Sequence, residues 1–276
     1  MVDIDAAIGY VVARGDKVDR ARLSWLRAAV PPSEDIVSHV EAGQTGNGGW
    51  PALGGGGVPS IDATCYRLAE LDDLDGLRRP AAKRALDWLA NRQRLDGYWE
   101  EDPALADVAP PWATPGDPEA RFYLTANAAF WLAVAAYDHS SAIAVDEFDA
   151  GPPLFDIPLT RASQALRDSV SEDGVWPGFL VSGWLAGAVL HRAGWFYEAA
   201  RIFVNLADRV KSMSPADVAS MAAALRRIGV GPEDSLLQAA RARLSETQRS
   251  DGSWPSDDET PAFDVQTTLT ALRAAR

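Results

Sequence analysis

The chain has 276 residues, 47% of them hydrophobic, and a formal net charge of −13. A chain of this length can bury a sizeable core, so it needs no disulfide or structural metal to fold. The strong negative charge argues against a nucleic-acid partner. A single cysteine excludes a disulfide framework and zinc clusters built from thiolates. We therefore predict no metal and no cofactor.

Targeting signals are not evident in the sequence. The N-terminus begins Met1-Val-Asp-Ile-Asp5, which is acidic and unlike the apolar core of a secretory signal. No window of about 20 apolar residues is present either, so we expect no transmembrane segment. These features predict a soluble, cytoplasmic protein, and they leave its oligomeric state open.

Amphipathic periodicity predicts helices along the whole chain. In chain order we expect them at about 3–14, 16–30, 34–42, 60–74, 77–92, 119–137, 159–171, 178–193, 195–210, 216–228, 233–247 and 262–275. Two long connections remain, at 100–118 and 139–155. Ordered loops of that length are often functional, so we interpret 100–118 as a lid and 139–155 as an insertion loop. The acidic run at 71–75 is expected to be exposed surface charge.

A pattern of Gln-x-x-x-Gly-x-Trp recurs between these helices. It runs from Gln44 to Trp50, from Gln93 to Trp99 and from Gln248 to Trp254, and a fourth copy ending at Trp176 has Val170 in place of Gln. Asn-Gly or Asp-Gly stops the preceding helix, since glycine accepts the left-handed conformation of a helix end. The Trp then anchors the turn, and its indole N–H needs a partner such as a carbonyl or the Gln side chain. Each copy is therefore a helix–turn–helix corner.

These segments resemble the QW repeats of squalene cyclases, class II terpene cyclases and related prenyltransferase-type proteins. The resemblance implies an all-α fold in which helices before and after each corner alternate between outer and inner positions. We predict a single (α/α)6 toroid domain covering 1–276. In such a toroid the corners gather at one end, where the inner helices begin.

Two aspartates are the candidate catalytic acids. The resemblance implies that an Asp in an Asp-x-Asp-Asp-Thr-Ala motif, at the start of an inner helix, protonates the substrate. Here Asp62 and Asp264 match only the last Asp of that motif, and Ile61 and Phe263 stand where the acid itself belongs. A carboxylic acid kept protonated by apolar surroundings is what this chemistry needs. The competing interpretation is that both residues are helix caps.

Aromatic and polar residues on the inner helices are candidates for substrate binding. Aromatic ring faces stabilise carbocations, although helix-spaced aromatics also fill cores. We select Trp112, Tyr123, Asn127, Trp131 and Trp184. Asp62 and Cys65 lack the spacing of the zinc ligands in protein prenyltransferases, which supports the prediction of no metal site.

Three functions are compatible with these features. The first is a terpene cyclase-like enzyme that protonates an isoprenoid substrate and directs cyclisation or isomerisation of the cation. The second is a non-catalytic toroid that binds a lipid or a protein. The third is a glycan-active toroid with paired carboxylates. The missing acid position favours the second function, and the aromatic residues and the lid favour the first.

Overall fold

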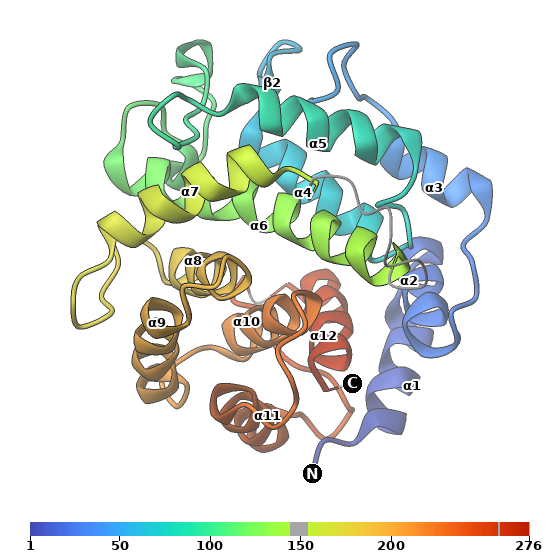
Figure 1. Cartoon of the computed structure of the whole chain (residues 1–276). Coiled ribbons are helices and arrows are strands. Elements are labelled where there is room, and N and C mark those ends of the chain that lie inside the picture. Colours follow the sequence, from blue (N-terminus) through green and yellow to red (C-terminus); the bar gives the residue numbers. More distant parts are fainter. Residues whose placement is uncertain (144–153, 259, 276) are drawn as a thin grey trace. The chain divides into compact units, whose positions relative to one another are not determined.

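The structure is a computed structural model that describes residues 1–143, 154–258 and 260–275. The described residues form twelve α-helices, two short 3-10 helices and one two-stranded ladder (Figure 1), which confirms the prediction of an all-α chain of about twelve helices. The chain divides into two compact units. Unit 1 comprises Met1–His39, Asp73–Asp75 and Phe203–Arg276, and unit 2 comprises Val40–Asp72 and Gly76–Ile202. None of the described helices is long and apolar enough to cross a membrane.

Unit 1 is built on helix α12, which packs against α1, α2, α10 and α11. The bounds of these five helices are α1 Ile4–Arg14, α2 Lys17–Ala28, α10 Pro215–Arg227, α11 Ser235–Thr247 and α12 Pro261–Ala275. Asp16 starts α2 with a capping box, in which it and Asp19 bond each other's backbone N–H groups. Helices α3 (Glu34–Glu41) and α9 (Phe196–Arg209) have residues in both units.

Unit 2 is built on the long helix α6 (Pro118–Ile143), which packs against its neighbours α4, α5, α7 and α8 (Figure 1). Those neighbours are α4 Ile61–Asp72, α5 Pro80–Arg92, α7 Asp156–Ser169 and α8 Leu180–Arg192. The remaining elements of the unit are β1 Trp50–Pro51, β2 Pro59–Ser60, η1 Pro103–Leu105 and η2 Pro111–Ala113. Strands β1 and β2 pair antiparallel, so they order both ends of the glycine-rich loop between them.

Helix α6 is longer than its sequence predicts. We expected it to end at Tyr137 and an insertion loop to follow at 139–155, but the helix continues to Ile143. The sequence from Asp138 to Ile143 contains no glycine or proline, so nothing in it stops the helix. The rest of the expected loop, 144–153, lies outside the described residues.

The three complete Gln–Gly–Trp corners share one hydrogen-bond pattern. Each indole N–H donates to a backbone carbonyl before the turn, from Trp50 to Ala42 (3.2 Å), Trp99 to Leu89 (2.8 Å) and Trp254 to Leu244 (2.8 Å). Each Trp backbone N–H donates to a Thr on the next helix, namely Thr64, Thr125 and Thr268. The Trp therefore joins the helices on both sides of its corner.

The Gln of each corner reaches a third segment. Its amide donates to the Gly carbonyl of its own turn and to a backbone carbonyl further on, at Ala81 for Gln44 and at Pro158 for Gln93. Gln248 donates to the carbonyl of Asp3 at 2.8 Å, across 245 positions of sequence. Within unit 1 this contact places the start of the chain beside the last corner.

The degenerate corner is packed differently, and it gives a test of the fold. Trp176 donates to the carbonyl of Phe179 (2.9 Å), and its ring lies against Gly183 of α8, where an added Cβ would lie 2.2 Å from two indole carbons. Gly183→Ala should therefore lower the free energy of unfolding by about 3 kcal/mol or more through overpacking.

Gly9→Ala in α1 is the matched control for this change. A Cβ at Gly9 meets nothing within 4 Å, so the same change in an open helical position should be neutral or stabilising by up to about 1 kcal/mol. Urea denaturation of both variants measures the difference. Equal stabilities of the two variants would contradict the packing of Trp176 on α8.

Candidate active site

The first turn of α4 is capped by a residue from outside the helix. Glu101 is 3% exposed, and its carboxylate accepts hydrogen bonds from the N–H groups of Ile61 (3.0 Å) and Asp62 (2.9 Å) and from the Ser60 hydroxyl (2.7 Å). Anionic groups are favoured at this end of a helix, where N–H groups are unpaired. Because Glu101 and Ser60 satisfy the helix end, the Asp62 side chain is free for other contacts.

Asp62 makes those contacts with two of the predicted binding residues. Its Oδ1 accepts a hydrogen bond from the Tyr123 hydroxyl of α6 at 2.9 Å, and its Oδ2 accepts one from the Trp112 indole N–H of η2 at 3.1 Å. The Tyr123 hydroxyl in turn accepts a hydrogen bond from the Asn127 amide at 3.0 Å. Both oxygens of Asp62 thus accept hydrogen bonds from side chains outside α4.

Burial raises the pKa of Asp62 above its ordinary value, and the hydrogen bonds from Trp112 and Tyr123 oppose that rise. Glu101 is the neighbouring acid, and its pKa is also raised, first by burial, against its hydrogen bonds, and further by the charge of Asp62. Burial raises the pKa of the Cys65 thiol well above its usual range, with smaller effects from the two carboxylates. The surroundings of Asp62 thus favour a carboxyl group that keeps its proton to a higher pH.

One face of α6 extends away from this cluster. Tyr123, Asn127 and Trp131 are spaced by four residues and so project from neighbouring positions on the helix. The Tyr123 ring meets the Phe179 ring edge-on, with centroids 6.4 Å apart. On α4, Tyr66 follows Asp62 by four residues and is 63% exposed. Aromatic side chains therefore border the acid on both helices.

Trp131 and Trp184 belong to the core of unit 2. They are 4% and 3% exposed, and Trp131 packs edge-on against Phe130 with centroids 5.3 Å apart. The geometry of both residues suits packing as well as it suits ligand contact. Of the seven residues selected from the sequence, hydrogen bonds join four: Asp62, Trp112, Tyr123 and Asn127.

Asp264 lies in unit 1 and has a different environment. Its carboxylate accepts hydrogen bonds from Arg249 (2.7 Å) and from the backbone N–H of Ser256 (2.7 Å). Burial alone raises the pKa of Asp264, but these hydrogen bonds and the Arg249 charge hold that pKa below its ordinary value. A carboxylate kept ionised in this way is poorly suited to donate a proton.

The sequence analysis did not select Glu101 or Ser60. Glu101 stands two residues after a corner Trp, and Ser60 directly precedes α4. Ser before a helix is a recognisable cap, and the Ser60 hydroxyl does accept the Ala63 N–H at 3.0 Å. No local signal identifies Glu101, because it reaches the helix from 40 positions away.

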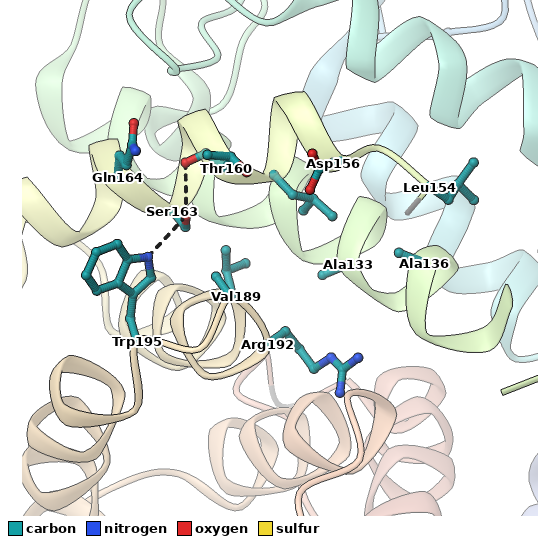
Figure 2. Close-up of a pocket in the computed structure, with 12 residues that line it drawn as sticks. Ala133, Ala136, Leu154, Asp156, Thr160, Ser163, Gln164, Val189, Arg192 and Trp195 are labelled. Atoms are coloured by element: carbon teal, nitrogen blue, oxygen red, sulfur yellow. Dashed lines mark hydrogen bonds between the residues drawn. The ribbon is translucent and has the colours of Figure 1, made fainter. Parts of the chain in front are cut away.

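A cavity of about 400 Å³ lies elsewhere in unit 2, between α6, α7 and α8 (Figure 2). Its lining includes Ala133, which is ten residues beyond Tyr123 and thus roughly 15 Å further along α6. In Figure 2 the Trp195 indole points to the Ser163 hydroxyl (3.4 Å), which donates to the carbonyl of Thr160 (3.0 Å). No sequence pattern indicated this cavity, and it is separate from the Asp62 cluster.

In 1–143, 154–258 and 260–275, no group of three or more His, Cys, Asp or Glu side chains is placed to hold a metal ion.

Comparison with known proteins identifies structural neighbours only. No family model and no curated protein matches the chain. A crystal structure of a protein from Actinoplanes is similar over 99% of this chain and 97% of its own, with TM-score 0.61 and 19% identity. The type II terpene cyclase MstE from Scytonema, in its apo form, is similar over 99% and 96%, with TM-score 0.56 and 15% identity. A variant of MstE in complex with its substrate geranylgeranyl dihydroxybenzoate has TM-score 0.53 and 16% identity.

These likenesses show the fold. They confirm that the chain has the all-α toroid fold of terpene cyclases, as its corners predict. At 15–19% identity these likenesses do not show the activity of the chain.

Proposed function

We propose that the chain is a terpene cyclase-like enzyme, in which Asp62 donates a proton to a carbon–carbon double bond or an epoxide of an isoprenoid. The observation that carries this proposal is Asp62 itself. It is a half-buried carboxyl group whose pKa is raised by burial, and Tyr123 and Trp112 hold its two oxygens. A general acid of this kind needs a raised pKa and a fixed orientation.

The reaction is balanced without a co-reactant. With a double bond, the O–H bond of Asp62 breaks as a new C–H bond forms, which leaves a tertiary carbocation on the substrate. With an epoxide, the proton goes to the ring oxygen and a C–O bond breaks, which leaves a carbocation on that carbon. A second double bond attacks the cation and closes a ring, or a neighbouring C–H gives up its proton in an isomerisation. The final loss of a proton to a base or to water restores neutrality, and proton uptake restores Asp62.

The side chains around Asp62 suit the other demands of this chemistry. The faces of Tyr66 and Trp131 are candidates for cation stabilisation. Asn127 fixes the Tyr123 hydroxyl, which in turn fixes one oxygen of the acid. Protonation leaves the diphosphate of a prenyl substrate attached, so this step needs no group that activates a leaving diphosphate. We propose a soluble cytoplasmic enzyme with a small apolar ligand and no cofactor.

The residues around Asp62 also bear on the two alternative functions, a glycan-active toroid and a non-catalytic lipid-binding toroid. A glycan-active toroid requires two carboxylates that face each other, but Glu101 is buried and occupied by three donors at the start of α4. A non-catalytic lipid-binding toroid is favoured by Ile61, which is apolar and 1% exposed at the position of the usual acid. This second function predicts that ligands bind without turnover.

Product analysis in heavy water tests the proposal. The purified chain is incubated with geranyl, farnesyl and geranylgeranyl diphosphates, squalene and geranylgeranyl dihydroxybenzoate, and products are analysed by mass spectrometry. We expect one substrate to give an isomeric product that keeps its polar head group and gains one deuterium in heavy water. Ligand binding without any product would support the lipid-binding alternative.

A further inference from the structure

The indole of Trp112 makes a contact with Asp62 that depends on the charge of the carboxyl group. Its N–H donates to Oδ2 at 3.1 Å, although the residue is 45% exposed. An indole N–H can only donate a hydrogen bond. The contact is therefore strong with a carboxylate and is weakened when Oδ2 carries the acid proton.

Tyr123, on the other oxygen, does not share this limitation. Its hydroxyl both donates and accepts, so rotation of the O–H lets it accept a proton from Oδ1 while Asn127 still donates to it. Protonation of Asp62 can thus be accommodated on the Tyr123 side without loss of a hydrogen bond. A proton on Oδ2 instead removes the Trp112 hydrogen bond, whereas a proton on Oδ1 leaves that bond in place without the help of a full negative charge.

The segment around Trp112 is fixed on both sides of the indole. Leu105 of η1 is fully buried, Ala113 of η2 is 1% exposed, and the Gly116 N–H donates to the Glu100 carboxylate at 3.0 Å. These anchors hold the backbone on both sides of Trp112. The movement they leave available is that of the Trp112 side chain.

We infer that Trp112 is a latch on the acid: its indole holds Asp62 while the carboxyl group is ionised and releases it when Oδ2 is protonated. This inference rests on the proposed function of Asp62 as the acid. In the closed state the indole covers a spent acid. Release exposes the protonated Oδ2 to substrate, which is the state needed for proton delivery. Trp112 is thus a positioning residue for the proposed reaction.

Three titratable groups face Asp62. They are Cys65 on α4, Glu101, which caps the start of α4, and Tyr123 on α6. Burial raises the pKa of each of the three. Asp62 and Glu101 are close enough to titrate together, so a test must observe Asp62 through its own partner. The Trp112 indole is that partner.

Nuclear magnetic resonance of the indole N–H groups tests the latch without any substrate. The signal of Trp112 is identified by its loss in Trp112→Phe and followed from mildly alkaline pH down to the ordinary pKa of an Asp side chain, about 3.9. We expect it to shift and to exchange faster with water as the pH falls through the pKa of Asp62. The indoles of Trp50, Trp99 and Trp254 donate to backbone carbonyls, so they serve as internal controls that do not titrate.

A second measurement follows from the reciprocity of linked equilibria. If protonation releases Trp112, then removal of the indole N–H must favour protonation. Trp112→Phe should therefore raise the pKa of Asp62 by about one unit, read from the carbon signal of the labelled carboxyl group. Asp62→Asn identifies that signal and should abolish the titration of the Trp112 indole.

The latch is overturned if the Trp112 indole is insensitive to pH, if it titrates equally in Asp62→Asn, or if Trp112→Phe leaves the pKa of Asp62 unchanged. These outcomes are independent of turnover. A pH-silent indole in an enzyme that makes product would remove the latch and keep the proposed function. A titrating indole in a protein that turns over no isoprenoid would remove the proposed function alone.

Discussion

Replacement of Asp62 by Asn is expected to lower turnover of the isoprenoid substrate by about a thousandfold, within the usual range for loss of a general acid. Asn has the same shape and keeps an oxygen that can accept from Tyr123 or from Trp112, but it has no acidic proton to give. The substrate should still bind, because the aromatic side chains are unchanged. Product formation at saturating substrate measures the loss.

Asp264→Asn is the matched control, since it makes the same change at the other acid selected from the sequence. Asp264 is paired with Arg249 and with the Ser256 N–H, so this variant should keep turnover within a few-fold and lose some thermal stability. The assignment of Asp62 is refuted if the two variants lose turnover to the same extent while both are folded, or if Asp62→Asn retains it.

Asp62→Asn should also change stability with pH in a predictable direction. Burial raises the pKa of Asp62 in the folded chain, so between the unfolded and folded pKa values the folded state binds more protons than the unfolded state. The contribution of Asp62 to stability is therefore present below the unfolded pKa and is lost as the pH rises through the folded pKa. At neutral pH the Asn variant should be at least as stable as the parent chain, which thermal denaturation can measure.

The Gln–Gly–Trp corners were predictable because the residues that form each corner lie close together in the sequence. A Gly that accepts a positive φ, a Trp that needs a partner for its N–H and a helix on each side are all visible within a few residues. The Thr that each Trp backbone N–H reaches is visible too, on the next helix: Thr64, Thr125 and Thr268. The fold follows from repetition of this unit.

The site was predictable only in part, because its contacts join distant segments. The position of Asp62 at a helix start is local, but its neighbours Trp112 and Tyr123 are 50 and 61 residues away. Asp264 has the same local position and a different partner, so sequence alone could not separate the two acids. The difference comes from Glu101, which caps α4 and leaves Asp62 free.

The acidic run at 71–75 also has contacts with distant segments that its sequence does not reveal. Its charge predicts an exposed surface, but the Asp73 side chain is only 16% exposed and pairs with three arginines. Arg22 comes from α2, Arg227 from α10 and Arg273 from α12, all in unit 1. The arginines are spread over some 250 positions of sequence, so no local pattern indicates their meeting.

Replacement of Asp73 by Asn is expected to cost about 3–5 kcal/mol of the free energy of unfolding, since loss of one partner leaves buried charges unpaired. Arg227 and Arg273 lie 2.9 and 2.7 Å from Oδ1, and Arg22 binds Oδ2. Without the Asp73 carboxylate, the guanidinium groups from α2, α10 and α12 lie close together and repel one another. Urea denaturation measures the loss, with Asp75→Asn as the control, because Asp75 is exposed and its left-handed backbone suits Asn equally.

The pH dependence of the stability difference between the parent chain and Asp73→Asn identifies the cause of that difference. Burial alone raises the pKa of Asp73, but the charges of Arg22, Arg273 and Arg227 hold that pKa well below its usual range. The carboxylate therefore contributes stability that is present above its unfolded pKa of about 3.9 and is lost as the pH falls toward the folded value. The stability gap between the parent chain and Asp73→Asn should narrow on acidification below about pH 4. A gap that stays constant with pH, or one no larger than that of Asp75→Asn, would show that Asp73 does not bind these helices through its charge.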